Sequence, residues 1–205
     1  MESAFLFFLQ QGYEHILDLN GIDHLLFIVA LCASYRLAEW KKVAILVTAF
    51  TIGHSVTLAM AALKIITFPS MVIEWLVPIT ILLTAIYNLL TATDEQYEED
   101  SFYLNTTVKY KYSIALFFGL IHGMAFSNFF KSTQMPGQES ELIQQLFAFN
   151  IGVEIGQLII VIIVLLIGFV AMNVLKIKQL LWSRSISIAI IIATFYLFYN
   201  LFTAV

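Results

Sequence analysis

The chain has 205 residues, of which 60% are hydrophobic and only 12% are charged. Soluble domains carry about 25% charged residues, so this composition indicates an integral membrane protein and excludes an ordinary soluble domain. The formal net charge is −4 and the ten basic residues are spread over the loops, so we expect no nucleic-acid partner. Cys32 is the single cysteine, which excludes an intrachain disulfide framework or a thiolate metal cluster.

Six apolar stretches are long enough to cross a bilayer as helices of about 20 residues. In chain order they cover residues 20–36, 43–63, 70–92, 111–130, 149–175 and 184–203. The aromatic stretch 3–17 is shorter and is predicted to lie on, or dip into, one interface, and 139–148 is predicted to be an amphipathic lead-in to the fifth span. We therefore predict an all-α, polytopic membrane protein, with six transmembrane helices plus a short N-terminal interfacial or re-entrant helix, that forms one integral membrane domain over residues 1–205.

The basic residues alternate between successive loops. Those that fall on one side of the predicted spans are Arg36, Lys41, Lys42, Lys109, Lys111, Lys176, Lys178 and Arg184, which leaves Lys64 and Lys131 on the other side. The positive-inside rule then predicts a multi-pass protein of the cell (inner) membrane with both termini outside. The acidic excess of the outer half either concentrates cations near an entrance or only reflects the depletion of basic residues there.

All four histidines and several carboxylates lie in or beside these apolar stretches. A charged residue at the centre of a span costs about 2.5–3.5 kcal/mol on insertion scales, so such groups are usually functional. Imidazole and carboxylate are also donors for divalent transition metals. The candidate metal ligands are Asp23, His24, His54, His122 and Glu154.

Asp23 and His24 follow Gly21 at the start of the first span. Neighbouring helical residues point about 100° apart, so we expect one of the two to ligate while the other orients a partner. The alternative is an aspartate stabilised by the helix dipole beside an interfacial histidine. His15, one predicted loop earlier, is a supporting polar candidate.

His54 and His122 are predicted to lie at matching depth on different helices. His54 is 12 residues from Lys42, about 18 Å along a helix, and His122 lies about 16 Å from Lys111. Hydroxyls near His54 are expected to hold its second ring nitrogen, and these are Thr51, Ser55 and Thr57. The alternative for each histidine is a plain hydrogen bond to a neighbouring helix.

The fifth span carries a polar stripe formed by Asn150, Glu154 and Gln157. This stripe either contributes to a metal site or only joins helices through hydrogen bonds. Two pairs of small residues, Gly119 with Gly123 and Gly152 with Gly156, predict close helix packing. In the third span, Glu74 and Asn88 are weaker candidates, because Glu74 could reach the interface and Asn88 could form an interhelical bond.

These motifs together resemble the HupE/UreJ family of membrane proteins associated with hydrogenase and urease maturation. The matching residues are His15, Gly21-Ile22-Asp23-His24, Phe50-Thr51, His54-Ser55, Thr57-Leu58, Gly119, His122-Gly123, Phe149-Asn150, Gly152-Val153-Glu154 and Gly156-Gln157, with Glu74 and Asn88 also fitting. More distantly, Asp23-His24 and Gly53-His54-Ser55 resemble signatures of nickel/cobalt transporters. The resemblance implies a permease-like protein of six or seven helices linked to nickel or cobalt uptake.

Three functions fit these observations. The first is a secondary transporter, not an enzyme, whose substrate is a divalent transition metal. The resemblance favours nickel or cobalt as that metal, whereas the types of ligand alone do not exclude zinc or copper. The second is an intramembrane zinc hydrolase, although the chain has no His-x-x-x-His or His-Glu-x-x-His motif. The third is a structural or assembly subunit, with a homo-oligomer or a membrane partner subunit as its context.

Overall fold

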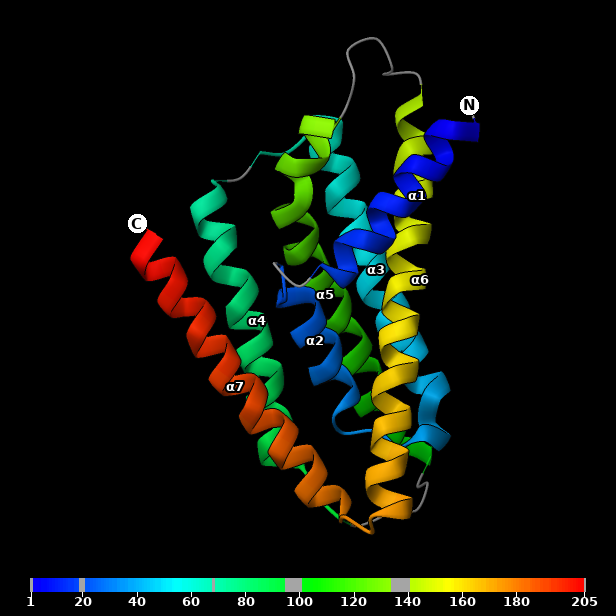
Figure 1. Ribbon diagram of the computed structural model, residues 1–205, viewed down its shortest axis with the longest axis vertical. Helices are drawn as coiled ribbons and strands as arrows, with labels where there is room; N and C mark the ends of the chain where they lie inside the picture. Colours follow the sequence, from blue (N-terminus) through cyan, green and yellow to red (C-terminus); the bar gives the residue numbers. More distant parts are fainter. Residues whose placement is uncertain (1, 19–20, 68, 95–100, 134–140, 205) are drawn as a thin grey trace.

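A computed structural model describes the backbone of residues 2–18, 21–67, 69–94, 101–133 and 141–204, and the side chains of 4–18, 21–67, 69–94, 110–126 and 141–203. Every regular element in this part of the chain is helical (Figure 1). The elements are α1 (Glu2–Leu17), α2 (Asp23–Cys32), η1 (Leu37–Glu39), α3 (Trp40–Ala62), α4 (Ser70–Thr91), α5 (Ser101–Thr133), α6 (Leu142–Phe169), the π-helical turn η3 (Val170–Val174) and α7 (Gln179–Ala204).

Four helical stretches of the described chain are long and apolar enough to cross a membrane. They are Leu37–Ala62, Ser70–Thr91, Leu142–Val174 and Gln179–Thr203. Large apolar side chains cover their outward faces, for example Leu83, Ile163 and Ile192, which are each about half exposed or more. A helix surface that is apolar on its outside indicates contact with lipid, so the chain is a multi-pass membrane protein.

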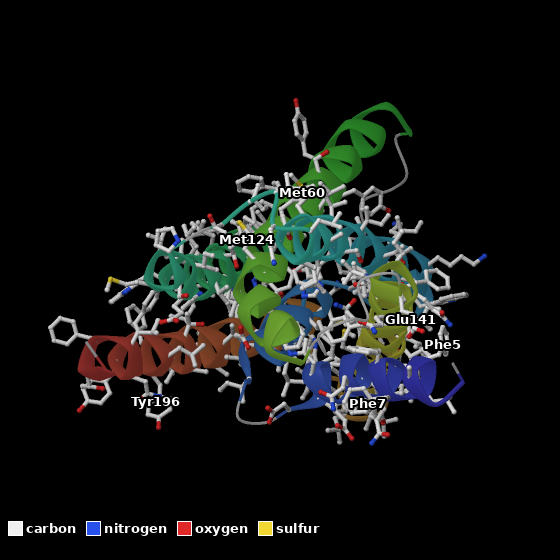
Figure 2. The ribbon with its side chains drawn as sticks, turned by 90° about the horizontal axis from the view of Figure 1, so that it is seen from above. Phe5, Phe7, Met60, Met124, Glu141 and Tyr196 are labelled. Carbon is white, nitrogen blue, oxygen red and sulfur yellow. The ribbon has the colours of Figure 1, made fainter. Side chains whose placement is uncertain are left out.

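The helices run along the long axis of the molecule. Helices α1 and α2 point the same way, the helices from α2 to α7 alternate in direction, and the two termini lie toward the same end (Figure 1). The pairs α3 with α5 and α1 with α6 make the most extensive contacts, and α4 packs against α7. The short helix α2 lies between these helix pairs and contacts α3, α4 and α6. Seen from above, Phe7 of α1 and Tyr196 of α7 point away from the bundle (Figure 2).

The predicted crossing helix over residues 20–36 is wrong. The helix here is α2, which has ten residues and is therefore about 15 Å long, half of a 30 Å hydrocarbon core. Polar side chains of other helices donate hydrogen bonds to backbone carbonyls near the C-terminal end of α2. The amide of Asn88 donates to the carbonyl of Ala30 at 2.6 Å, and that of Gln179 donates to the carbonyl of Ser34 at 3.0 Å.

Two further boundaries differ from the prediction. The lead-in at 139–148 is not a separate amphipathic element in its described part, because residues from Leu142 onward are the first turns of α6. Leu146 and Phe149, on those turns, are buried in the bundle. Helix α5 begins at Ser101, about ten residues before the predicted span, since polar residues lengthen it beyond the apolar stretch.

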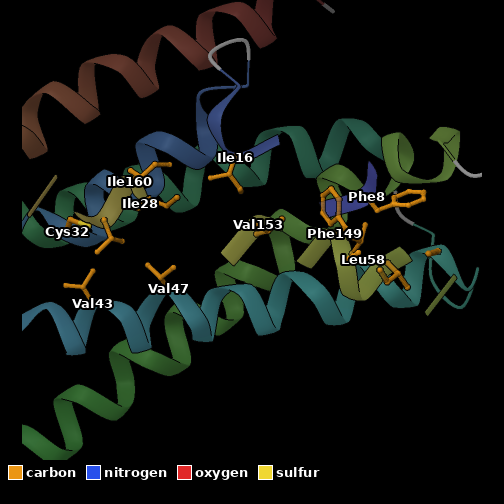
Figure 3. Close-up of a cluster of buried hydrophobic side chains, with 14 of the residues drawn as sticks. Phe8, Ile16, Ile28, Cys32, Val43, Val47, Leu58, Phe149, Val153 and Ile160 are labelled. Carbon is orange, nitrogen blue, oxygen red and sulfur yellow. The ribbon is translucent and has the colours of Figure 1, made fainter. Parts of the chain in front are cut away.

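Two buried clusters hold the helices together. One, between α1, α2, α3 and α6, includes Phe8, Ile16, Val47 and Val153 (Figure 3). The other joins α2 to α3, α4 and α5. Its members include Phe27, Phe50, Val77, Ile81 and Ile121. Burial of apolar area provides about 25 cal/mol per Å², although within lipid the packing contacts themselves carry more of the stabilisation. The histidines lie where the two clusters meet.

Candidate metal site

Close contacts between backbones build the frame of the site. On the α3–α5 pair, Gly53 lies against the carbonyl of Leu116, and Gly119 lies against the carbonyl of Phe50. A Cβ atom at either glycine would clash with that carbonyl, so the two backbones touch only because side chains are missing there. This pairing brings the segments that carry His54 and His122 together.

The α1–α6 pair is built in the same way. Gly12 lies against the carbonyl of Phe149, and Gly152 lies against the carbonyl of Leu9. Gly156, one turn further along α6, is near the Cβ atom of Ile16 at 3.2 Å from the position of its own missing Cβ. Helix α1 is therefore packed lengthwise into the bundle, which places His15 at its inner end.

The four histidines converge at the break between α1 and α2. Their ring centroids are 4.6 Å apart for His15 and His24, 5.1 Å for His24 and His122, 5.9 Å for His24 and His54, and 6.1 Å for His15 and His54. Each ring comes from a different helix, namely α1, α2, α3 and α5. His54 and His122 are fully buried and His24 is 2% exposed. Four imidazoles thus share one region of the bundle interior.

Most ring nitrogens of this cluster have no hydrogen-bond partner among the described residues. They are Nε2 of His15, Nδ1 and Nε2 of His24, Nδ1 and Nε2 of His54, and Nδ1 of His122. A buried polar atom without a partner costs about 1–3 kcal/mol, and buried polar groups of native proteins are normally satisfied. Donor atoms of His15, His24 and His54 lie within 4.8 Å of one another, and a cation bound to one nitrogen of each ring would offset part of this cost.

Asp23 adds a carboxylate to the cluster. Its Oδ1 atom lies 3.4 Å from Nδ1 of His24 and its side chain is 26% exposed. Two sets of three groups place their donor atoms within 4.8 Å of one another: His15 with His24 and His54, and Asp23 with His24 and His122. Two donors on one ion, each at about 2.0–2.1 Å, lie up to about 4.2 Å apart, so small side-chain rotations close either set.

Thr80 of α4 fixes the orientation of His122. Its hydroxyl donates to the carbonyl of Val77 at 2.7 Å, so its only hydrogen is used and its oxygen must accept from Nε2–H of His122, at 2.9 Å. Nδ1 of His122 then carries the lone pair and is the atom available to a metal. Sequence reasoning missed Thr80, because a lone hydroxyl in an apolar span has no motif around it.

The hydroxyls predicted to hold His54 do not reach its ring, so that prediction is wrong. Ser55 donates to the carbonyl of Thr51 at 2.7 Å, and Thr57 donates to the carbonyls of Gly53 and His54 at 3.2 and 3.3 Å. Hydroxyls on a helix bond readily to carbonyls three or four residues earlier, which removes them as partners for side chains. The Thr51 hydroxyl lies 2.8 Å from Oε1 of Gln157, a link between α3 and α6.

The structure does not bring Glu154 into the histidine cluster. Its Oε1 atom accepts a hydrogen bond from Thr48 at 2.6 Å. Thr48 lies six residues before His54 on α3, which is about 9 Å along the helix. Glu154 therefore bonds to α3 about two helical turns from the imidazole of His54.

The remaining predicted residues lie as follows. Asn88 is buried and ties α4 to Ala30 of α2 and to the hydroxyl of Ser34, which follows α2. Glu74 is exposed, and the amide of Asn150 donates to the carbonyl of Leu146 on its own helix. Gly123 lies against the carbonyl of His54, next to the cluster.

One comparison with known protein families gives a match. The family described as HupE / UreJ protein matches residues 1–200. The chain belongs to the HupE/UreJ family. Membership links it to nickel- and cobalt-related membrane proteins, in a family of metal permeases and accessory proteins that is not a known enzyme family. No curated protein matches the chain, and no solved structure matches it.

Proposed function

We propose that this chain is a secondary transporter for a divalent transition metal, with nickel or cobalt as its substrate. The observation that carries the proposal is the convergence of imidazoles from four helices, with buried ring nitrogens that have no hydrogen-bond partner among the described residues. A purely structural cluster would be expected to satisfy those nitrogens with hydroxyls and carbonyls, in the way that Thr80 pairs with the other ring nitrogen of His122, Nε2. In this proposal His24, His54 and His122 are ligands together with Asp23, and His15 joins them.

The break between α1 and α2 supports the same function. Transporters often hold ions at a discontinuous helix near the middle of the bilayer. The carbonyl end of α1 provides partial negative charge for a cation, and the carboxylate of Asp23 offsets the positive start of α2. We propose that α1 and α2 cross the membrane together, since their 16 and 10 residues amount to about 39 Å of helix.

This arrangement supports six crossings, formed by α1 with α2 and by each of α3 to α7. An even number of crossings places both termini on one side, in agreement with their position at one end of the molecule (Figure 1). The loops rich in lysine and arginine, such as Arg36–Lys42, lie at the opposite end. Under the positive-inside rule that end faces the cytoplasm and both termini face outward.

Uptake of radiolabelled Ni²⁺ into proteoliposomes tests the proposal. We expect uptake by the unaltered chain, and uptake at the background of protein-free vesicles for His54→Gln and His122→Gln. The matched control is Ser187→Ala, because Ser187 is equally buried but donates to Ser183 on its own helix, α7. Size-exclusion profiles and helix content must match for all variants.

Two results would contradict the proposal. One is uptake that persists unchanged in both histidine variants. The other is zinc-dependent turnover of a lipid or peptide by the purified chain without any ion flux, which would favour a hydrolase.

A further inference from the structure

His24 belongs to both groups of potential ligands. The first set is His15, His24 and His54, and the second set is Asp23, His24 and His122. His24 is 2% exposed, and neither of its ring nitrogens has a hydrogen bond within the described chain. It lies between the other rings, with centroids 4.6 Å from His15 and 5.1 Å from His122. One residue therefore connects two places where an ion fits.

The chemistry of imidazole limits how these two places are used. A neutral imidazole has one N–H group and one lone pair, so it ligates a single ion at a time. Two divalent ions a few ångströms apart would also repel each other strongly in surroundings of low polarity. The two sets thus compete for His24, and filling one leaves the other with only two of its three groups.

We propose that the metal ion has two alternative positions that share His24 as a common ligand, so that it moves between them without leaving the protein. This inference rests on the transport function proposed above. The two positions differ in chemistry: the first set offers three imidazoles and no charge, whereas the second offers two imidazoles and the carboxylate of Asp23. His122 is oriented by Thr80 with Nδ1 free, whereas the polar neighbour of His24 is Asp23, itself a member of the second set, with Oδ1 3.4 Å from Nδ1 of His24. Among the described ligands, His24 is the member that belongs to both sets and can serve either position.

Binding of Co²⁺ to the purified full chain in detergent tests this inference, with visible absorption for affinity and X-ray absorption for the ligands. The unaltered chain should bind one Co²⁺. His54→Gln should still bind one Co²⁺, now with two imidazoles and a carboxylate oxygen, with affinity reduced less than about tenfold. His122→Gln should also bind one, with three imidazoles, and His24→Gln should lose more than about 100-fold because both sets lose a ligand.

Asp23→Asn is a second variant of the second set and should give the same three-imidazole spectrum as His122→Gln. Ser187→Ala is the folding control and should bind like the unaltered chain. Two Co²⁺ ions bound at once to the unaltered chain would overturn the inference. Loss of all binding in both His54→Gln and His122→Gln would also overturn it, since that result means one indivisible site, while transport itself would stand. A chain that binds no Co²⁺ or Ni²⁺ at all would overturn the proposed function as well.

Discussion

Thr80→Val removes one hydroxyl while it keeps the shape of the side chain. Thr80 is 2% exposed, and its oxygen accepts the Nε2–H of His122 at 2.9 Å. Without it, a buried N–H group is left unpaired, at a cost of about 1–3 kcal/mol. His122 is then free to place its proton on Nδ1, the atom that faces the ligand set. Loss of such an orienting partner weakens metal binding by about 10–100-fold, or about 1.4–2.7 kcal/mol.

Two measurements check this reasoning. Co²⁺ titration gives the affinity, and ¹⁵N NMR of histidine-labelled, metal-free protein reports the tautomer of His122 directly. Thr80→Ser should retain both the affinity and the Nε2–H signal. Thr84→Val is the matched control, because Thr84 lies one turn later on α4 and donates to the carbonyl of Thr80 at 2.8 Å. An unchanged affinity and an unchanged ¹⁵N spectrum in Thr80→Val would refute the role of this hydroxyl.

Two further predictions concern helix packing and Glu154. Gly53→Ala should prevent close packing of α3 on α5 and abolish the monodisperse folded protein. Gly168→Ala should be tolerated, because the nearest neighbour of the added Cβ would be a ring carbon of Trp182 at 3.5 Å. Size-exclusion profiles distinguish the two variants. Glu154→Gln should leave Co²⁺ affinity within about threefold, because Glu154 bonds to Thr48 and not to the cluster; a loss of 100-fold would make it a ligand.

Hydropathy predicted the helices α3, α4, α6 and α7 to within several residues, because a continuous apolar run leaves little choice within lipid. It was wrong for α2. Apolar residues continue past Cys32, but interactions with Asn88 and Gln179, which lie far away in the sequence, accompany the end of the helix. Periodicity within one stretch carries no information on such partners.

Within the site, the motifs pointed to Asp23, His24, His54 and His122, and the structure brings these four together with His15. Glu154 was predicted to join them because it is a carboxylate in an apolar span. The polarity of a side chain does not specify which neighbouring residues it contacts. The packing of α1 into the bundle does have a signal in the sequence. Gly12 precedes His15 by three residues, and Gly119 precedes His122 by the same spacing. Thr80 had no signal, since its role depends on a helix 42 residues away in the sequence.

The most direct test of the metal site is anomalous X-ray diffraction from crystals of the full chain soaked with Ni²⁺ and measured at the nickel absorption edge. The account predicts a strong anomalous peak within ligand distance, about 2.1 Å, of a ring nitrogen of His24, with further donors from His15 and His54 or from Asp23 and His122. Nickel peaks confined to the outer surface of the protein, with none among these rings, would contradict it.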